Sequence, residues 1–242
     1  MRIKERIINK FIIRNAELKK RIELYSKIIK KDDLVFDIGA NHGNRVTPFL
    51  EIGSKIVAVE PNPLLANKLT KKFGRKITVI QKAIGDEIGT VELYVNDSDV
   101  LSTTSKEFIE KAKATGRFGE LSNAFNNVVN VEMISIENLF KEYGYPVFIK
   151  IDTEGLEYKI IKTLNNNKVK ALSFEFAIPE SLEEVLLSLE YLNSIGYVKF
   201  NISFGESMDF LTHVNIDFID FIDFISKLPK MSWGDIYAFN KL

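Results

Sequence analysis

Carboxylate side chains follow several apolar runs in this sequence, and their positions suggest a nucleoside-binding site. Asp37 lies in DLVFDIGANHG, where Gly39 and Gly43 break the first apolar run before a helix-like segment. Glu60 closes the second run, IVAVEPNP, 21 residues after Gly39. A carboxylate at the end of a second strand can accept hydrogen bonds from both hydroxyls of a ribose. The alternative for Glu60 is an ordinary strand-end polar residue before a proline turn.

The glycine spacing argues against a dinucleotide. The dinucleotide fingerprint GxGxxG needs a glycine two positions after the first, and Asn41 stands there instead. Asp37 could hold loop amides or the ammonium of an amino acid, whereas it would repel a pyrophosphate. In the third run, VIQKAIGD, backbone groups around Ala83 and the side chain of Asp86 suit the edge and amino group of a purine. Together these features favour S-adenosylmethionine over NAD.

Four side chains are candidates for a general base near this site. Asp152 and Glu154 follow the fourth run, in FIKIDTEGLEYKII, and Glu175 stands between phenylalanines in SFEF. His42 lies in the glycine loop and has a pKa range suited to proton transfer, although it could instead pack on the first helix. The acids could also serve as helix N-terminal charges. Clustered carboxylates could bind Mg²⁺, but the sequence assigns no metal ligand.

Apolar runs and helix-like segments alternate from Leu34 onward, which predicts a doubly wound, mainly parallel sheet of the α/β class. The strand candidates are residues 34–38, 56–59, 77–80, 147–151 and 171–176, and the helix candidates are 45–52, 63–73, 156–164 and 182–195. GYVKFNIS and DIYAFN are also strand-like. GTVELYVN predicts an extra strand, and the polar residues 97–127 predict a long loop with a short helix. In NIDFIDFIDFISKL, the aspartates predict the solvated side of a core helix.

Composition predicts one soluble domain with a basic N-terminal extension. The chain has 242 residues, 45% of them hydrophobic, no cysteine and a formal net charge of zero, which argues against a general nucleic-acid binder. Residues 1–31 hold 11 Lys and Arg against 3 Asp and Glu, which leaves 22 against 30 for the remaining residues 32–242. Helical spacing in 1–31 predicts an amphipathic extension that either caps the domain or contacts an anionic or membrane surface. Neither a membrane-spanning run nor a secretory signal is recognised, so we expect a cytoplasmic protein.

The motifs VFDIGANHG, VAVEPNP, KAIGD, FIKIDTEGLEYKII and LSFEF together resemble the FkbM-type family of S-adenosylmethionine-dependent methyltransferases. The resemblance covers residues 33–176, and the KIDxEGxE block is its specific part. It implies a seven-stranded, Rossmann-like class I methyltransferase sheet and methyl transfer to a hydroxyl of a sugar, a glycolipid or a secondary metabolite. The cofactor contacts that it implies are Asp37, Gly39, Ala40, Asn41, Gly43, Glu60, Pro61, Ala83, Asp86 and Asp152. Residues 97–127 lie outside the shared motifs, and we expect this insertion to contribute to acceptor specificity.

Two other functions remain open at this point. One is a binding or scaffold protein that keeps S-adenosylmethionine without turnover. The other, less favoured, is a nucleic-acid methyltransferase guided by the basic extension. The expected partner is a small-molecule or saccharide acceptor rather than a nucleic acid, and a homo-oligomer is compatible with the sequence.

Overall fold

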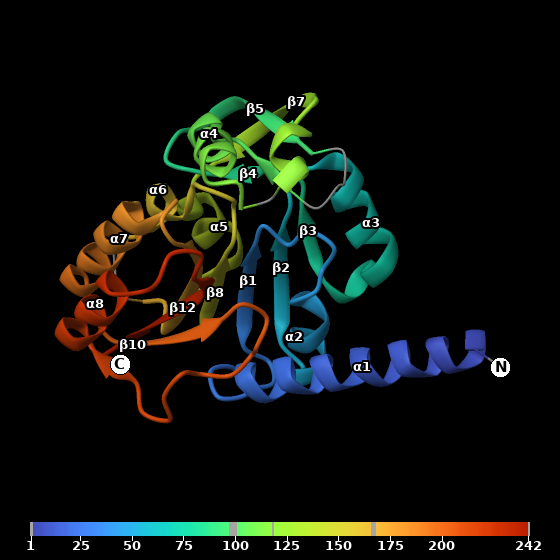
Figure 1. Cartoon of the computed structure of the whole chain (residues 1–242), viewed down its shortest axis with the longest axis horizontal. Helices are drawn as coiled ribbons and strands as arrows, with labels where there is room; N and C mark the ends of the chain where they lie inside the picture. Colours follow the sequence, from blue (N-terminus) through green and yellow to red (C-terminus); the bar gives the residue numbers. More distant parts are fainter. Residues whose placement is uncertain (1, 97–100, 118, 166–167, 242) are drawn as a thin grey trace.

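An eight-stranded sheet forms the centre of the computed structural model, which describes residues 2–96, 101–117, 119–165 and 168–241. Side chains are described from residue 13 onward, except at residue 122. The strand order is β11-β10-β12-β9-β8-β1-β2-β3 (Figure 1). The strands are β1 (Leu34–Ile38), β2 (Lys55–Val59), β3 (Thr78–Ile80), β8 (Phe148–Ile151), β9 (Ala171–Ala177), β10 (Tyr197–Phe204), β11 (Ile216–Asp217) and β12 (Trp233–Asn240).

The central strands are parallel, as their apolar runs predicted. β1 pairs in parallel with β2 on one side and β8 on the other, and all four residues of β8 are buried. Strands buried on both faces read as continuous apolar runs, which is why these were recognisable in the sequence. β12 is antiparallel to both of its neighbours. The predicted sheet had seven strands; the eighth, β11, is a two-residue edge strand on β10.

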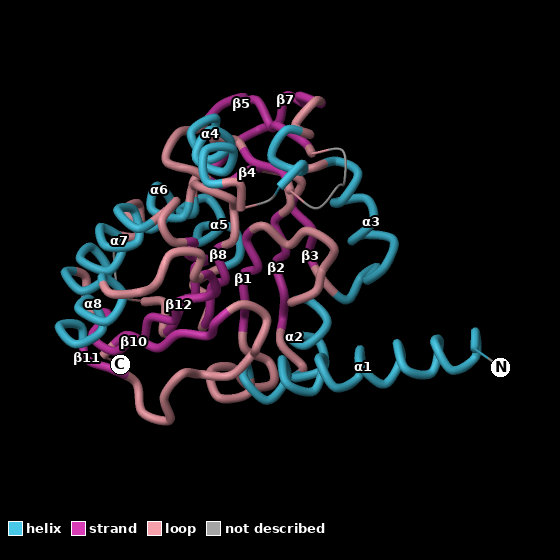
Figure 2. The backbone as a smooth tube through the Cα atoms, viewed as in Figure 1, coloured by secondary structure: helices cyan, strands magenta, loops and turns pink. Residues whose placement is uncertain are grey.

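Helices cover both faces of the sheet (Figure 2). On one face lie α1 (Arg2–Tyr25), α2 (Val46–Ile52) and α3 (Pro63–Phe73), which is followed by the short helix η1 (Gly74–Lys76). On the other lie α5 (Ile136–Tyr143), α6 (Glu157–Ile161), α7 (Leu182–Ser194) and α8 (Phe218–Ser226). Alternate residues of β1 serve the two cores: Val35 packs toward α1 and α2, and Phe36 packs toward α5.

The aspartate stripe of α8 lies on its solvent side, as predicted. Asp220 and Asp223 are exposed, whereas Phe221 and Ile225 are buried. Asp223 pairs with Lys227 at 2.6 Å. The stripe is therefore the polar face of a core helix.

A second, four-stranded sheet lies beyond the carboxyl ends of the central strands, where it carries the predicted insertion (Figure 1). Its order is β4-β7-β5-β6, formed by β4 (Ala83–Ile84), β7 (Asn127–Ile134), β5 (Gly89–Val95) and β6 (Ser102–Thr103). The predicted extra strand GTVELYVN is β5. Residues 97–127 also contain α4 (Lys106–Thr115) and η2 (Gly119–Asn123); residues 97–100 and 118 lie outside the described part of the chain.

The basic extension forms one helix, α1, at the opposite end of the strands from the second sheet (Figure 1). Its C-terminal end packs on the domain: Leu24 and Tyr25 are buried, and the Tyr25 ring lies 4.7 Å from that of Phe49. Residues 13–17 are exposed. The first part of the predicted amphipathic pattern, residues 1–12, falls on side chains outside the described set. Within the described residues, no helix combines the length and the apolar character needed to span a bilayer.

Candidate active site

A pocket opens at the carboxyl ends of β1, β2 and β8, where the residues after each strand meet. In an open parallel sheet, ligands bind at this edge. The loop after β1 contributes one wall, the loop after β2 a second and the start of the insertion a third. The lining residues are Ile38, Gly39, Asn41, Val59, Glu60, Pro61, Leu65, Lys82, Ala83, Ile84, Leu93, Ser102, Thr103, Thr104, Asp152, Thr153, Glu154 and Leu156.

Gly39 allows the loop after β1 to lie directly against the loop after β8. It has φ +83°, and a Cβ atom there would stand 1.7 Å from the carbonyl oxygen of Asp152. The amide of Gly39 donates to the carbonyl of Val59 at 2.9 Å. Asn41 follows at φ +48°, a conformation that asparagine tolerates better than most residues. Glycine at position 39 therefore allows the backbone after β1 to approach the backbone after β8 closely.

We expect Gly39→Ala to destabilise the protein by about 3 kcal/mol or more, because both the positive φ and the contact with Asp152 oppose a side chain. Gly116→Ala is the matched control: Gly116 has φ +68° but no atom within 4 Å of its Cβ position, and its expected cost is about 1 kcal/mol. Urea unfolding measures both. Equal losses would show that the close approach to Asp152 has no energetic weight.

Glu60 organises the two loops that face the pocket. Its side chain is 3% exposed. One carboxylate oxygen accepts the amide of Asn41 and the other accepts the amide of Asn62, each at 2.8 Å. The pKa of Glu60 is raised to about 7, because the effect of burial exceeds the opposite effect of these two amides. Each carboxylate oxygen can accept more than one hydrogen bond, so Glu60 fits the diol of a ribose lying in this pocket.

Asp37 lies beneath the pocket, on the face of the sheet that packs against α1 and α2. It is 1% exposed, and neither of its carboxyl oxygens has a hydrogen-bond partner among the described residues. Its neighbour across the sheet is Lys150, whose Nζ lies 2.5 Å from Asp152 Oδ2. Burial alone would lower the pKa of Lys150, but the carboxylates of Asp152, Asp235 and Asp37 raise it above its ordinary value. Lys150 thus carries a permanent positive charge beneath the site.

Burial raises the pKa of Asp37 from 3.8 to about 6, and this shift makes stability depend on pH. Between about pH 4 and 6 the folded protein binds a proton that the unfolded chain has released, so the free energy of unfolding falls as pH rises. We expect Asp37→Asn to reduce this slope by the part that Asp37 contributes, and to stabilise the protein at pH 8 by about 1–3 kcal/mol. Urea unfolding at pH 4.5, 6 and 8 tests this, with the exposed Asp220→Asn as control. An unchanged slope would contradict it.

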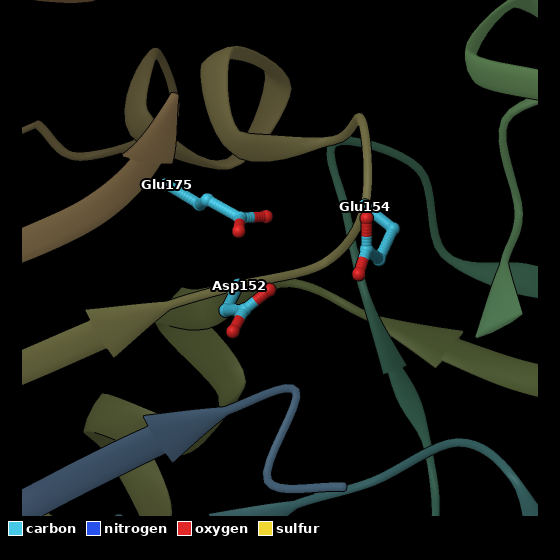
Figure 3. A group of neighbouring side chains, drawn as sticks. All are labelled: Asp152, Glu154 and Glu175. Carbon is cyan, nitrogen blue, oxygen red and sulfur yellow. The ribbon is translucent and has the colours of Figure 1, made fainter. Parts of the chain in front are cut away.

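Three carboxyl groups converge beside the pocket, two of them from its lining (Figure 3). Asp152 follows β8, Glu154 lies in the next loop and Glu175 comes from β9, and one oxygen of each lies within 4.8 Å of the others. Neither Glu154 nor Glu175 has a hydrogen-bond or ion-pair partner for its carboxyl group among the described residues. Desolvation and then the charge of Asp152 raise the pKa of both well above the ordinary value. The cluster could accept a proton; it could also ligate a divalent cation, and we assign no metal to it.

A second cleft adjoins the first and shares Glu154 with it. It lies between α4 of the insertion and the segment formed by α6, the end of β9 and α7. Its walls combine apolar surface with many carboxylates. The lining residues are Ser105, Glu107, Phe108, Lys111, Glu154, Gly155, Glu157, Tyr158, Lys159, Glu175, Phe176, Ala177, Glu180, Ser181, Glu183, Glu184 and Leu187.

The KIDTEGLE block builds the wall between the two clefts. Glu157 accepts the amide of Thr153 at 2.7 Å and that of Gly155 at 2.9 Å, so it holds the loop rather than the ligand. Gly155 has φ +106°, and a Cβ atom there would lie 2.8 Å from the Cβ of Phe108. Glu154 has φ +55°. The block therefore fixes a loop that carries one unpaired carboxyl toward both clefts.

The structure brings together most, but not all, of the predicted site residues. Those that line the first pocket are Gly39, Asn41, Glu60, Pro61, Ala83, Asp152 and Glu154, and Glu175 lines the second cleft. Those outside both linings are Asp37, Ala40, His42, Gly43 and Asp86. Their predicted contacts stay predictions.

Local contacts explain where three of those outer residues lie. His42 is exposed, and its carbonyl accepts a hydrogen bond from Lys72 at 2.9 Å. Gly43 lies against Phe73 of α3, where a Cβ atom would stand 2.5 Å from the ring. Asp86 pairs with Lys162 at 2.9 Å, and its pKa is lowered because this pairing outweighs its desolvation.

Sequence reasoning missed the contribution of residues 102–104 and of α4. Ser102, Thr103 and Thr104 line the first pocket, whereas Phe108 and Lys111 line the second. The region was predicted to be on the acceptor side as a whole. Ser105 could have indicated the start of α4, because its side chain caps the helix by accepting the amide of Phe108.

The strand order, with the antiparallel strand β12 between β10 and β9 of a mainly parallel sheet, and the pocket at the carboxyl ends of the strands are those of a class I methyltransferase. The sequence matches the methyltransferase FkbM domain family over residues 37–199. The chain therefore belongs to this family, and its cofactor is S-adenosylmethionine. No match is found among curated proteins.

Solved structures of similar fold are remote in sequence. A precorrin-6Y C5,15-methyltransferase from Geobacter metallireducens is 13% identical, with a TM-score of 0.46 over 95% of this chain and 88% of that chain. The magnesium protoporphyrin IX methyltransferase from Synechocystis PCC 6803, solved with bound cofactor, is 8% identical, with a TM-score of 0.47 over 94% and 79%. An rRNA methylase from Streptococcus thermophilus is 10% identical, with a TM-score of 0.44 over 90% and 93%.

Proposed function

We propose that this methyltransferase transfers the methyl group to a hydroxyl oxygen of a small polar acceptor, such as a sugar, a glycolipid or a hydroxylated secondary metabolite. One observation carries the proposal: Glu154 and Glu175 bring two unpaired carboxyl groups to the junction of the cofactor pocket and the second cleft. Methylation of a hydroxyl needs a group that removes its proton, and this junction supplies one.

The residues of this chain would divide the work as follows. S-adenosylmethionine supplies an activated methyl group when it is bound. Glu60 would hold the ribose, while Asn41, Pro61 and Ala83 shape the rest of the first pocket. Asp152, held by Lys150, lines the first pocket. Glu154 or Glu175 would accept the hydroxyl proton, and their raised pKa makes either a stronger base than an ordinary carboxylate. Holding the acceptor in place accounts for much of the remaining rate.

The charge of the second cleft supports a neutral rather than an anionic acceptor. Seven glutamates and two lysines line it. Some of these acids are neutralised, since Glu180 pairs with Arg117 at 2.8 Å and Glu184 with Lys111 at 2.5 Å. Glu154 and Glu175 have no such partner within the part of the chain that the structure describes. The carboxylates of the cleft would repel the phosphates of a nucleic acid, so this charge disfavours a nucleic-acid acceptor.

The basic helix α1 lies at the far end of the strands from this cleft (Figure 1). It is therefore not placed to guide an acceptor into the cleft. We propose that residues 1–31 act apart from catalysis, as a cap on the domain or as a contact with an anionic surface. A cytoplasmic location stays a prediction, as does the assignment of residues 32–242 to a single methyltransferase domain.

Release of S-adenosylhomocysteine tests the proposal. The protein is incubated with S-adenosylmethionine in parallel reactions. One set contains sugars and glycolipids, another an extract of hydroxylated metabolites, and a third total RNA. We expect release with at least one hydroxylated small acceptor and none with RNA. Release with RNA alone would contradict the proposal. Binding of the cofactor without release in any reaction would favour the non-catalytic alternative.

A further inference from the structure

The segment that begins the insertion forms a wall common to both clefts. Residues 102–104 line the cofactor pocket, and Ser105, Phe108 and Lys111 line the second cleft. β6 pairs with β5, and α4 starts three residues after the end of β6. A single side chain at this junction can therefore affect both sites.

Thr103 is that side chain. It is 1% exposed. Its Oγ1 donates a hydrogen bond to the carbonyl oxygen of Glu154 at 2.6 Å. Thr103 Oγ1 also accepts a hydrogen bond from the amide of Ser105 at 2.9 Å, and the side chain of Ser105 in turn caps α4. The hydroxyl of Thr103 thus ties the first turn of α4 to the loop that carries Glu154.

The backbone of Glu154 needs such a support. Its φ of +55° is uncommon for a residue other than glycine and persists only where the surroundings hold it. Glu157 fixes the adjacent amide of Gly155, and Phe108 packs against Gly155 from the other side. On the carbonyl of Glu154, the only side-chain hydrogen bond among the described residues comes from Thr103. In this conformation the carboxyl group of Glu154 points toward Asp152 and Glu175 (Figure 3).

We propose that Thr103 is a positioning residue: its hydroxyl holds Glu154 in the conformation that presents its carboxyl group to the acceptor. The inference rests on the proposed function, because it gives Glu154 a part in the reaction. It adds that the insertion controls the geometry of the catalytic cluster through one hydrogen bond, besides forming the acceptor wall.

Thr103→Val and Thr103→Ser separate the hydroxyl from the shape of the side chain. Valine keeps the branched shape and removes both hydrogen bonds, whereas serine keeps the hydroxyl. The direct readout is the titration of the Glu154 carboxyl by carbon NMR on glutamate-labelled protein, with the resonance assigned through Glu154→Gln. We expect Thr103→Val to move the pKa of Glu154 toward its ordinary value, because the carboxyl leaves its neighbours, and Thr103→Ser to keep it near the wild-type value.

Binding and turnover complete the test. We expect Thr103→Val to lower kcat by about 10-fold or more, since small displacements of a reacting group are costly, and to weaken the binding of S-adenosylhomocysteine by a smaller factor. Thr103→Ser should keep most of the activity. If Thr103→Val does not fold, Thr103→Ala replaces it, with the same expectations.

An unchanged Glu154 titration in the variant without the hydroxyl would overturn the proposal. Equal effects of valine and serine would also overturn it, because they would show a packing role. Failure of the proposed function gives a different result: the wild-type protein would release no S-adenosylhomocysteine, while the titration would still report whether Thr103 holds Glu154.

Discussion

Replacement of Glu60 by glutamine should weaken the binding of S-adenosylhomocysteine by about 10- to 100-fold. The carboxylate of Glu60 accepts the amides of Asn41 and Asn62, and we assign the ribose hydroxyls to its remaining acceptor positions. Glutamine offers one acceptor oxygen, and its NH₂ group would face one of these amides. Hydrogen bonds to a charged group contribute about 1.5–3 kcal/mol each, which corresponds to this loss of affinity. Isothermal titration measures the effect.

Glu51→Gln is the matched control for this substitution. Glu51 lies on the nearby helix α2 and is exposed, so its replacement should leave the affinity unchanged. If Glu60→Gln bound as tightly as the wild type, the ribose would lie elsewhere, and the assignment of the pocket would be wrong. A thermal melt of the free protein separates a binding effect from loss of the loop structure.

The second large effect is expected at the carboxyl cluster. Glu154→Gln or Glu175→Gln should reduce kcat by about 10²- to 10⁴-fold, the usual contribution of a general base. Whichever residue gives the larger loss takes the proton. The affinity of Glu175→Gln for S-adenosylhomocysteine should remain close to that of the wild type, because Glu175 lies outside the first pocket. Glu190→Gln, at an exposed position on α7, is the control. Losses below about 3-fold in both cluster variants would contradict a base at this junction.

The same cluster predicts how activity depends on pH. Burial and the charge of Asp152 raise the pKa of Glu154 and Glu175, and a base acts only when it is deprotonated. The wild-type kcat/KM should therefore fall as the pH is lowered through the raised pKa, at a higher pH than an ordinary carboxylate would require. In the variant that lacks the base, the remaining activity should lose this dependence. A flat profile in the wild type would contradict the assignment.

The sequence predicted the centre of the fold well, because burial on both faces gives strands a continuous apolar signal. β1 and α3 have the predicted bounds, and Pro63 at the start of α3 follows a known preference for the first helical position. The helix predicted for residues 156–164 is shorter, Glu157–Ile161, because the chain after it makes tight turns, in which the amides of Thr163 and Leu164 bond to carbonyls three residues earlier. β7 and α5 were not predicted, although Val129, Val131 and Met133 alternate in NVVNVEMI.

The site residues were predictable where a residue type stands at a fixed place relative to a strand. They were less predictable where a contact joins segments that are distant in the sequence. Glu60 was found because an acid closes a strand at a fixed place in the chain. By contrast, the hydrogen bond from Thr103 to Glu154 joins residues 51 positions apart, and no local pattern encodes it. Asp37 illustrates a further limit: strand alternation puts its side chain on the face toward α1 and α2, which only the observed packing identifies.

A structure of the complex with S-adenosylhomocysteine tests the central claim most directly. We predict that the ribose hydroxyls bind the carboxylate of Glu60, that the purine lies against residues 82–84, and that the sulfur faces the second cleft, toward Glu154 and Glu175. A nucleoside bound away from Glu60, or a sulfur directed away from the cleft walled by α4, would contradict the account.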